Sequence, residues 1–265
     1  MRDRYAIIGN PVAHSKSPRI HAEFARATGQ DLEYGRIEAP LDGFERAVDE
    51  FRSQGGKGLN VTLPFKRAAF RYCDRVSGRA RAAEVVNTLV FGDDVFGDTT
   101  DGVGLVTDLT RNLEVVLSAK QVLLMGAGGA AQGVVQALLD AGVAHLAIAN
   151  RTLSRAEALA ARFPGVTSWS YDGLGGREFD VVVNATSAGL ANDAPVLPAS
   201  VLKPGALAYD MVYGRDTPFL AAARAAGAQA CDGLGMLVEQ AAEAFLLWRG
   251  VRPETSGVLE RLRAG

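Results

Sequence analysis

The stretch Gln121-Val-Leu-Leu-Met-Gly-Ala-Gly-Gly-Ala-Ala131 joins a short apolar strand directly to a glycine-rich turn. Residues 121–125 are continuously apolar, as in a strand buried within a parallel sheet, and a helix should follow to about Ala141. The turn has the Gly-x-Gly-x-x-Ala pattern, whose glycines permit a tight turn and let the backbone approach a pyrophosphate at a helix N-terminus. We therefore expect a dinucleotide to be bound by Gly126, Ala127, Gly128, Gly129 and Ala130.

The end of the next predicted strand, residues 145–150, indicates which dinucleotide binds. Chains that bind NAD usually carry Asp or Glu here, which accepts hydrogen bonds from the ribose hydroxyls. This chain continues Asn150-Arg-Thr-Leu-Ser-Arg155, with two guanidinium groups and a hydroxyl for a 2′-phosphate and no carboxylate to repel it. We expect NADP, bound by Asn150, Arg151, Thr152 and Arg155. In the alternative interpretation, Asn150 and Thr152 only cap a helix over 153–163.

Strands and helices continue to alternate as far as residue 231. Further strands are predicted over 166–170, 180–184, 206–210 and 229–231. This order is typical of an open, doubly wound parallel sheet of the Rossmann type. The small residues of 185–189 would let a cofactor ring lie against the backbone.

A second informative stretch is Gly58-Leu-Asn-Val-Thr-Leu-Pro-Phe-Lys66. Apolar and polar residues alternate through it, as in a strand buried on one face, and Pro64 ends the strand because proline has no N–H to donate. The side chains of Asn60, Thr62 and Lys66 should converge where the strand ends, which is where open α/β sheets hold their ligands. The alternative is a surface strand followed by a solvated lysine.

Two further polar residues follow in the N-terminal half. Asn87 lies within an apolar strand predicted over 85–90, so it needs a hydrogen-bonding partner if it is buried, and a ligand could supply one. Asp101 follows the next strand, where it could simply cap a helix over 102–112. The functional interpretation pairs Asp101 with Lys66, because an amine beside a carboxylate can bind a hydroxyl and move its proton.

The loop His14-Ser-Lys-Ser-Pro18 contains two serines before a predicted helix that ends near Thr28. Ser17 precedes a proline and is expected to be the N-cap of that helix. Ser15 has no such role, so its hydroxyl is freer to meet a ligand. In the alternative interpretation both serines only shape the loop.

Composition limits the classes of partner. The chain has 28 basic and 30 acidic residues and a formal charge of −2, which offers no electrostatic footprint for nucleic acid or a membrane surface. Its three histidines and its two distant cysteines, Cys73 and Cys231, suggest no metal site. The apolar run after the N-terminus is too short for a signal peptide or a membrane span. We expect a cytoplasmic protein; the sequence leaves its oligomeric state open, a homodimer included.

Taken together, these motifs resemble those of the shikimate dehydrogenases along the whole chain. The matching segments are residues 9–21, 58–66, 87–88, 98–104, 150–155 and 232–240. The resemblance implies a three-layer α/β substrate domain formed by residues 1–101 and 237–265. It also implies a Rossmann-type NADP domain over 102–236, separated from the first by a cleft.

The same resemblance implies an activity and residue roles. The reaction would be reversible reduction of 3-dehydroshikimate to shikimate with NADPH, a step of aromatic amino acid and chorismate biosynthesis. Lys66 would be the catalytic acid/base, with Asp101 as its partner. The residues implied for the substrate, a small molecule, are Ser15, Ser17, Thr62, Asn87, Asp101, Tyr213 and Gln240. Those implied for the cofactor are residues 126–130 and 150–155, Met211 and Gly233.

Three other readings remain open from the sequence. The nearest is a relative that prefers quinate or accepts NAD. A second is a non-catalytic NADP-binding sensor, against which the presence of both Lys66 and Asp101 argues. A third is a folate-linked dehydrogenase of similar architecture, whose longer substrate would need a more aromatic site than a chain with 7% aromatic residues offers.

Overall fold

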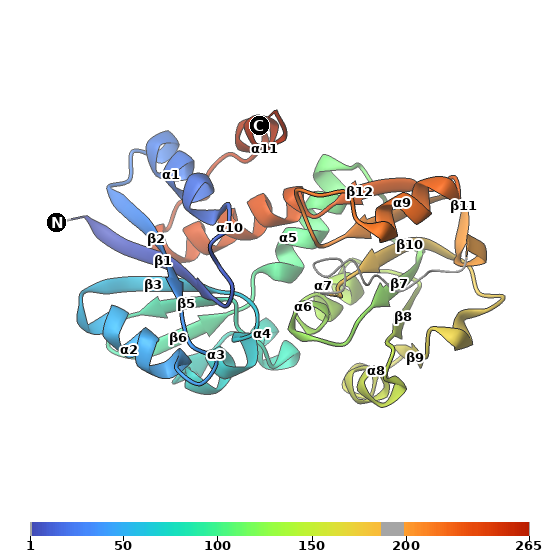
Figure 1. The fold of residues 1–265 in the computed structure, drawn as a ribbon, viewed down its shortest axis with the longest axis horizontal. Coiled ribbons are helices and arrows are strands. Elements are labelled where there is room, and N and C mark those ends of the chain that lie inside the picture. Colours follow the sequence, from blue (N-terminus) through green and yellow to red (C-terminus); the bar gives the residue numbers. More distant parts are fainter. Residues whose placement is uncertain (1, 187–198, 265) are drawn as a thin grey trace. The chain divides into compact units, whose positions relative to one another are not determined.

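A computed structural model describes residues 2–186 and 199–264. Two compact units are formed: unit 1 consists of Met1–Gly104 and Leu237–Gly265, and unit 2 of Leu105–Met236. Each unit has its own six-stranded sheet. The predicted α/β class with two sheets is confirmed (Figure 1). The contacts divide the chain after Gly104 and before Leu237.

Unit 1 is built on a mixed sheet with strand order β2-β1-β3-β5-β6-β4. Strands β1, β2 and β3 are parallel, and β5 runs antiparallel to β3 and β6. The strands are β1 (Asp3–Gly9), β2 (Leu32–Glu38), β3 (Gly56–Val61), β4 (Arg75–Val76), β5 (Thr88–Phe91) and β6 (Val95–Asp98). The helices are α1 (Ser17–Thr28), α2 (Phe44–Ser53), α3 (Lys66–Tyr72), α4 (Gly78–Ala83) and α11 (Ser256–Arg263).

Helices cover both faces of this sheet because its central strands are apolar on both. On one face Leu59 and Val61 of β3 pack in a buried cluster with Phe44 of α2 and Ala69 of α3. On the other face the ring of Tyr5 in β1 stacks on Trp248 at 4.6 Å between centroids. Trp248 belongs to α10 (Leu234–Arg249), so a helix from the end of the chain completes a unit that the beginning of the chain starts.

Unit 2 is an all-parallel sheet with strand order β12-β11-β10-β7-β8-β9. Its central strand β7 is buried from Val122 to Met125, as its continuous apolar run predicts. The strands are β7 (Gln121–Met125), β8 (His145–Ala149), β9 (Thr167–Trp169), β10 (Phe179–Asn184), β11 (Leu202–Asp210) and β12 (Gln229–Asp232). The α-helices are α6 (Gly129–Gln132), α7 (Val135–Asp140), α8 (Leu153–Ala160) and α9 (Pro218–Ala225), and the short turns are η1 (Asp108–Asn112), η2 (Asp172–Leu174) and η4 (Ala199–Val201).

Two predicted helices have a different form in the structure. The helix expected to continue from the glycine-rich turn to Ala141 is broken between α6 and α7, at Gly133 and Val134. Glycine and β-branched valine are poor helix formers, which explains the position of the break. The helix expected over 102–112 consists of α5 (Asp101–Thr107) followed by the π-helical turn η1.

Among the described residues, no helix is long and apolar enough to cross a membrane.

Candidate active site

Lys66 and Asp101, the lysine–aspartate pair, meet within unit 1 as the functional interpretation predicted. Lys66 is the first residue of α3 and Asp101 the first residue of α5. Lys66 Nζ donates a hydrogen bond to Asp101 Oδ2, and the two side chains are only 13% and 7% exposed. The pair combines a proton donor and a proton acceptor that are largely withdrawn from water, which suits it to proton transfer with a bound hydroxyl.

Asn87 fixes the other oxygen of the aspartate. Its Nδ2 donates to Asp101 Oδ1 at 2.9 Å and to Thr100 Oγ1 at 2.9 Å, while its Oδ1 accepts from the Thr100 backbone N–H at 2.8 Å. Asn87 is buried, and it directly precedes β5 rather than lying inside a strand, so the predicted strand began too early. Protein groups therefore supply partners to an amide that was expected to need them.

Asn60 belongs to the same network, whereas Thr62 packs elsewhere. Asn60 Nδ2 donates to the Asn87 carbonyl at 3.3 Å and to Thr88 Oγ1 at 3.2 Å. The methyl group of Thr62 lies against Gly9, where an added Cβ would come within 2.4 Å of Thr62 Cγ2. The structure thus connects Asn60 through Asn87 to the lysine–aspartate pair.

The two loop serines hydrogen-bond to each other, and neither occupies the N-cap position of α1. Ser17 is the first residue of α1 and Lys16 occupies the N-cap position, so the prediction that Ser17 caps this helix is wrong. The Ser17 N–H donates to Ser15 Oγ at 3.2 Å, and the two hydroxyls are also 3.2 Å apart. The N–H of Ser17, like the others of the first helical turn, has no acceptor within the helix, so a group earlier in the chain must accept from it. Both side chains are buried.

Gln240 of α10 completes the polar cluster of unit 1. Its Oε1 lies 3.4 Å from Asn87 Nδ2 and 3.4 Å from Thr100 Oγ1, and its Nε2 donates to the Leu237 carbonyl at 2.8 Å. Tyr213, which the family resemblance placed with these residues, belongs to unit 2 and follows β11.

The glycine-rich turn of unit 2 has a backbone that only glycine adopts readily and that is open to an approaching group. Gly126 has φ +104°, which L side chains rarely adopt, and an added Cβ there would lie 3.2 Å from the Ala185 carbonyl oxygen. At Gly128, just before α6, an added Cβ would meet nothing within 4 Å, so the backbone is open to an approaching group. Gly126, Ala127, Gly128, Gly129 and Ala130 therefore fit a dinucleotide.

The segment expected to bind a 2′-phosphate follows β8 and is exposed. Residues 151–155 are all exposed, so both Arg151 and Arg155 present their guanidinium groups to solvent. Thr152 is the N-cap residue of α8, but its side chain makes no capping hydrogen bond, and Asn150 Nδ2 donates to the Thr152 carbonyl at 2.8 Å. The geometry does not favour capping as the purpose of Thr152, and it leaves the segment suited to an anion.

Met211 and Gly233 meet at the ends of β11 and β12. An added Cβ on Gly233 would lie 2.5 Å from the Met211 carbonyl oxygen, so only glycine allows this approach, and the Gly233 N–H donates to the Val212 carbonyl at 3.2 Å. In the loop predicted to accommodate a ring, Ala185 donates its N–H to the Met125 carbonyl at 2.9 Å. Residues 187–189 of that loop lie outside the described residues.

Sequence reasoning missed Tyr34 and Thr88, and the supporting role of Asp98. The Tyr34 hydroxyl donates to Asn60 Oδ1 at 2.7 Å, and Thr88 Oγ1 donates to Asn87 Oδ1 at 2.9 Å. Asp98 accepts from Arg79 at 2.6 and 2.8 Å, which anchors the segment that carries the aspartate of the pair. The sequence shows that Tyr34 lies in a predicted strand, but the register of that strand is needed to tell that its side chain shares a face of the sheet with Asn60.

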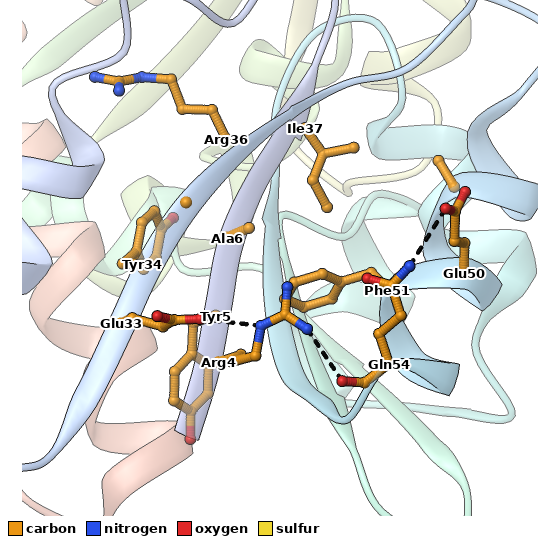
Figure 2. Close-up of a pocket in the computed structure, with 12 residues that line it drawn as sticks. Arg4, Tyr5, Ala6, Glu33, Tyr34, Arg36, Ile37, Glu50, Phe51 and Gln54 are labelled. Carbon is orange, nitrogen blue, oxygen red and sulfur yellow. Dashed lines mark hydrogen bonds and ion pairs between the residues drawn. The ribbon is translucent and has the colours of Figure 1, made fainter. Parts of the chain in front are cut away.

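A pocket of about 480 Å³ lies beside β1, β2 and α2, and Tyr34, whose hydroxyl reaches Asn60, is among its lining residues. Figure 2 shows Arg4 in it, hydrogen-bonded to Glu33 and to the Gln54 carbonyl, with Phe51 close by. None of the residues predicted to bind substrate or cofactor lines this pocket. Its rim of exposed, mutually paired charges contrasts with the buried network around the lysine–aspartate pair.

Comparison with protein families gives three matches along the chain. Residues 7–89 match the shikimate dehydrogenase substrate binding domain, and residues 108–197 match the shikimate/quinate 5-dehydrogenase family. Residues 233–263 match the shikimate 5′-dehydrogenase C-terminal domain. The matched ranges include Lys66 and Asn87 of unit 1 and the glycine-rich turn of unit 2, whereas Asp101, Met211 and Tyr213 lie between them.

Individual proteins resemble the chain over nearly its full length. The NADP(+)-dependent shikimate dehydrogenase of Aromatoleum aromaticum is 60% identical over 98% of this chain and 97% of its own. The crystal structure of an Ael1 enzyme from Pseudomonas putida is 50% identical, covers 98% of both chains and has a TM-score of 0.91. Shikimate 5-dehydrogenase from Thermus thermophilus, solved with NADP(H) and shikimate, is 37% identical, covers 99% of both chains and has a TM-score of 0.89.

Proposed function

Because the chain belongs to the shikimate dehydrogenase family, we propose that it catalyses the NADP-dependent, reversible reduction of 3-dehydroshikimate to shikimate. One observation carries the proposal: the buried Lys66–Asp101 pair, with Asn87 holding the second carboxylate oxygen. Such a pair is what an alcohol–ketone interconversion needs beside a hydride carrier, since each hydride transfer is accompanied by movement of one hydroxyl proton.

The chemical step assigns a task to each member of the pair. In the oxidative direction the substrate hydroxyl donates its proton to the pair as the alcohol carbon loses hydride, and in the reductive direction Lys66 Nζ returns a proton to the carbonyl oxygen. Asp101 orients the amine through Oδ2 and is itself held by Asn87 through Oδ1. NADP, when bound, supplies the hydride acceptor. The chain's own contribution is therefore orientation of the alcohol and handling of its proton.

The substrate carries a carboxylate and several hydroxyls, and unit 1 offers matching donors and acceptors. The residues of unit 1 that we propose for its binding are Ser15, Ser17, Asn60, Thr62, Asn87 and Gln240, and we propose Tyr213 of unit 2 together with them. Support comes from the clustering of Asn60, Asn87 and Gln240 around the lysine–aspartate pair, with atoms separated by 3.4 Å or less. A polyhydroxylated substrate suits this cluster, because its hydroxyls can both donate to and accept from amide and carboxylate groups.

The cofactor site is assigned to unit 2. The residues that we propose are Gly126, Ala127, Gly128, Gly129, Ala130, Asn150, Arg151, Thr152, Arg155, Met211 and Gly233. The positive φ of Gly126 and the open approach to Gly128 support pyrophosphate binding, and the exposed pair Arg151 and Arg155 supports binding of the 2′-phosphate.

A cytoplasmic location is part of the same proposal. Cys73 and Cys231 form no disulfide, as is usual for cysteines of proteins in a reducing compartment. The homodimer also stays a prediction, which size-exclusion chromatography with light scattering would test.

The direct test is steady-state oxidation of shikimate and of quinate, each with NADP and with NAD, followed by the absorbance of the reduced nicotinamide. We expect fast turnover only with shikimate and NADP. Comparable rates with quinate or NAD would instead assign the chain to the broader shikimate/quinate members of the family. No turnover in any of the four assays, with NADP still bound, would overturn the proposed activity and favour a sensor.

A further inference from the structure

Tyr34 begins a chain of hydrogen bonds that runs through unit 1 to the lysine–aspartate pair. Its hydroxyl lies 2.7 Å from Asn60 Oδ1, and Asn60 Nδ2 lies 3.2 Å from Thr88 Oγ1. Thr88 Oγ1 lies 2.9 Å from Asn87 Oδ1, and Asn87 Nδ2 lies 2.9 Å from Asp101 Oδ1. The residues come from separate strands and loops, so strand pairing brings the links together: Asn60 of β3 lies opposite Thr88 of β5.

The direction of each hydrogen bond in this chain is determined by fixed backbone groups. Asn60 Nδ2 faces the Asn87 carbonyl, which can only accept, so Asn60 Oδ1 must be the atom that faces Tyr34, and the tyrosine hydroxyl must donate. Asn87 Oδ1 faces the Thr100 backbone N–H, which can only donate, so Asn87 Nδ2 must face the carboxylate. Thr88 accepts from one amide and donates to the other. Every link therefore donates towards the carboxylate of the pair.

The ring of Tyr34 is held in place by a buried histidine. His21 of α1 stacks on it at 4.2 Å between ring centroids with an interplanar angle of 5°, and His21 is fully buried. Neither ring nitrogen of His21 has a hydrogen-bond partner among the described residues. Figure 2 shows Tyr34 and Arg36 on one side of β2 and Ile37 on the other. The stack orients the hydroxyl of Tyr34 towards Asn60 without competing for its proton.

The hydroxyl of Tyr34 remains a donor across the working pH range. Burial, the largest cause, raises its pKa well above the ordinary value of 10.0, and the hydrogen bond to Ser17 and the charge of Arg36 only partly oppose that shift. Arg36 also donates to the Ser15 carbonyl at 2.6 Å. Tyr34 is thus connected both to the two serines and to the asparagines of the cluster.

We infer that Tyr34 and Thr88 are positioning residues for the reaction: through Asn60 and Asn87 they fix the aspartate of the pair in the orientation that holds Lys66. This inference rests on the proposed function. It predicts that the hydroxyl groups at these two positions affect turnover although neither reaches the lysine–aspartate pair directly. Tyr34 belongs to the edge strand β2, so the catalytic geometry depends on a strand that lies outside the motifs identified in the sequence.

The test compares Tyr34→Phe, Thr88→Val and the double variant with wild type. Each single variant should lower kcat for shikimate oxidation about fivefold, the size of one lost buried hydrogen bond, with the KM for NADP unchanged. The double variant should lose about the same factor as the worse single variant, because both substitutions interrupt one chain through shared partners. Thr88→Ser, which keeps the hydroxyl, should restore most of the kcat.

Two outcomes would overturn the inference: unchanged kcat in both single variants, or multiplication of the two losses in the double variant. Thermal unfolding of each variant separates these effects from general destabilisation, and Tyr34→Phe, which keeps the stacked ring, gives a result even if Thr88→Val fails to fold. Wild type is assayed first. Absence of shikimate turnover in wild type would refute the proposed function, whereas turnover in wild type with unaffected variants would refute only the positioning roles.

Discussion

The proposed sites of the two units are built by different means. Unit 1 uses side chains: Asn60, Asn87 and Asp101 are buried and hydrogen-bonded to one another through fixed partners. Unit 2 offers backbone groups and exposed charges: its turn requires the positive φ of Gly126, and Arg151 is exposed to solvent. Chemistry at a hydroxyl needs atoms held to within a fraction of an ångström, whereas recognition of phosphate needs charge and open N–H groups. A side-chain substitution should therefore damage the two units unequally.

The largest effect should come from removing the amine of the pair. Lys66→Ala should lower kcat about a thousandfold, since general acid–base groups contribute rate factors of that order. The dissociation constant for NADP, measured by fluorescence titration, should stay within about twofold because the residues proposed for the cofactor lie in unit 2. Lys57→Ala, which removes an exposed lysine of β3, is the matched control. Equal loss of turnover and of NADP binding would show that the functions of the two units are not separable in this way.

The next effect tests the exposed charge of unit 2. Arg151→Ala should weaken NADP binding by roughly tenfold to a hundredfold, the range expected for a lost charge-assisted phosphate contact, and leave NAD binding nearly unchanged. Isothermal titration with both dinucleotides gives the comparison within one variant. If both affinities fell together, Arg151 would act on the shared part of the cofactor rather than on the 2′-phosphate.

A third experiment uses the buried histidine of unit 1. Burial is the largest cause that lowers the pKa of His21 to about 3 from its ordinary value of 6.5, and the Asn60 side chain raises this pKa by a smaller amount. Between these values the unfolded chain binds the proton that the folded chain excludes, so the free energy of unfolding should rise with pH by at most about 1.4 kcal/mol per unit. This contribution is complete above pH 6.5 and is lost progressively as the pH falls towards 3.

His21→Phe isolates that contribution, because every other titrating group is common to both proteins. Urea unfolding at pH 5, 6 and 7 should show that wild type loses free energy of unfolding relative to the variant as the pH falls. A difference that is constant with pH would mean that His21 is hydrated or protonated in the folded state.

The smallest effect should come from Thr152. Its side chain makes no capping hydrogen bond, so Thr152→Ala should change the free energy of unfolding by about 0.5 kcal/mol or less. Ser77→Ala is the contrasting variant, since Ser77 caps α4 by accepting from the Ala80 N–H at 3.1 Å, and loss of such a cap costs about 1 kcal/mol. Equal losses by thermal unfolding would restore the interpretation of Thr152 as a cap.

Local patterns in the sequence predicted most strands and the glycine-rich turn because each depends on residues adjacent in the chain. The pairing of Lys66 with Asp101 was also predicted, but from chemistry, since two groups that follow strand ends tend to meet. The error at Ser17 has a local cause as well. Ser17 fits the cap pattern because it precedes Pro18, but the backbone places Lys16 at the N-cap position and Ser17 inside the helix.

Tyr34 could not be predicted to join the site, because its role depends on how strands pair. Parallel registry places Tyr34 of β2 beside Tyr5 of β1, and Tyr5 beside Gly58 of β3, two residues before Asn60. A shift of one residue in either pairing would turn Tyr34 to the opposite face. The register of these strands depends on three separate segments, so it cannot be read from any single stretch of the sequence.

The chain order of unit 1 has a consequence for its synthesis. Tyr5, His21 and Tyr34 are made early, but the aromatic partners Phe245 and Trp248 that cover them come from α10, after all of unit 2. Unit 2 is one continuous segment, so it can fold before synthesis of the chain is complete. The N-terminal part of unit 1 has its aromatic face uncovered until α10 has been synthesised. During this interval the exposed face can bind a chaperone or another nascent chain.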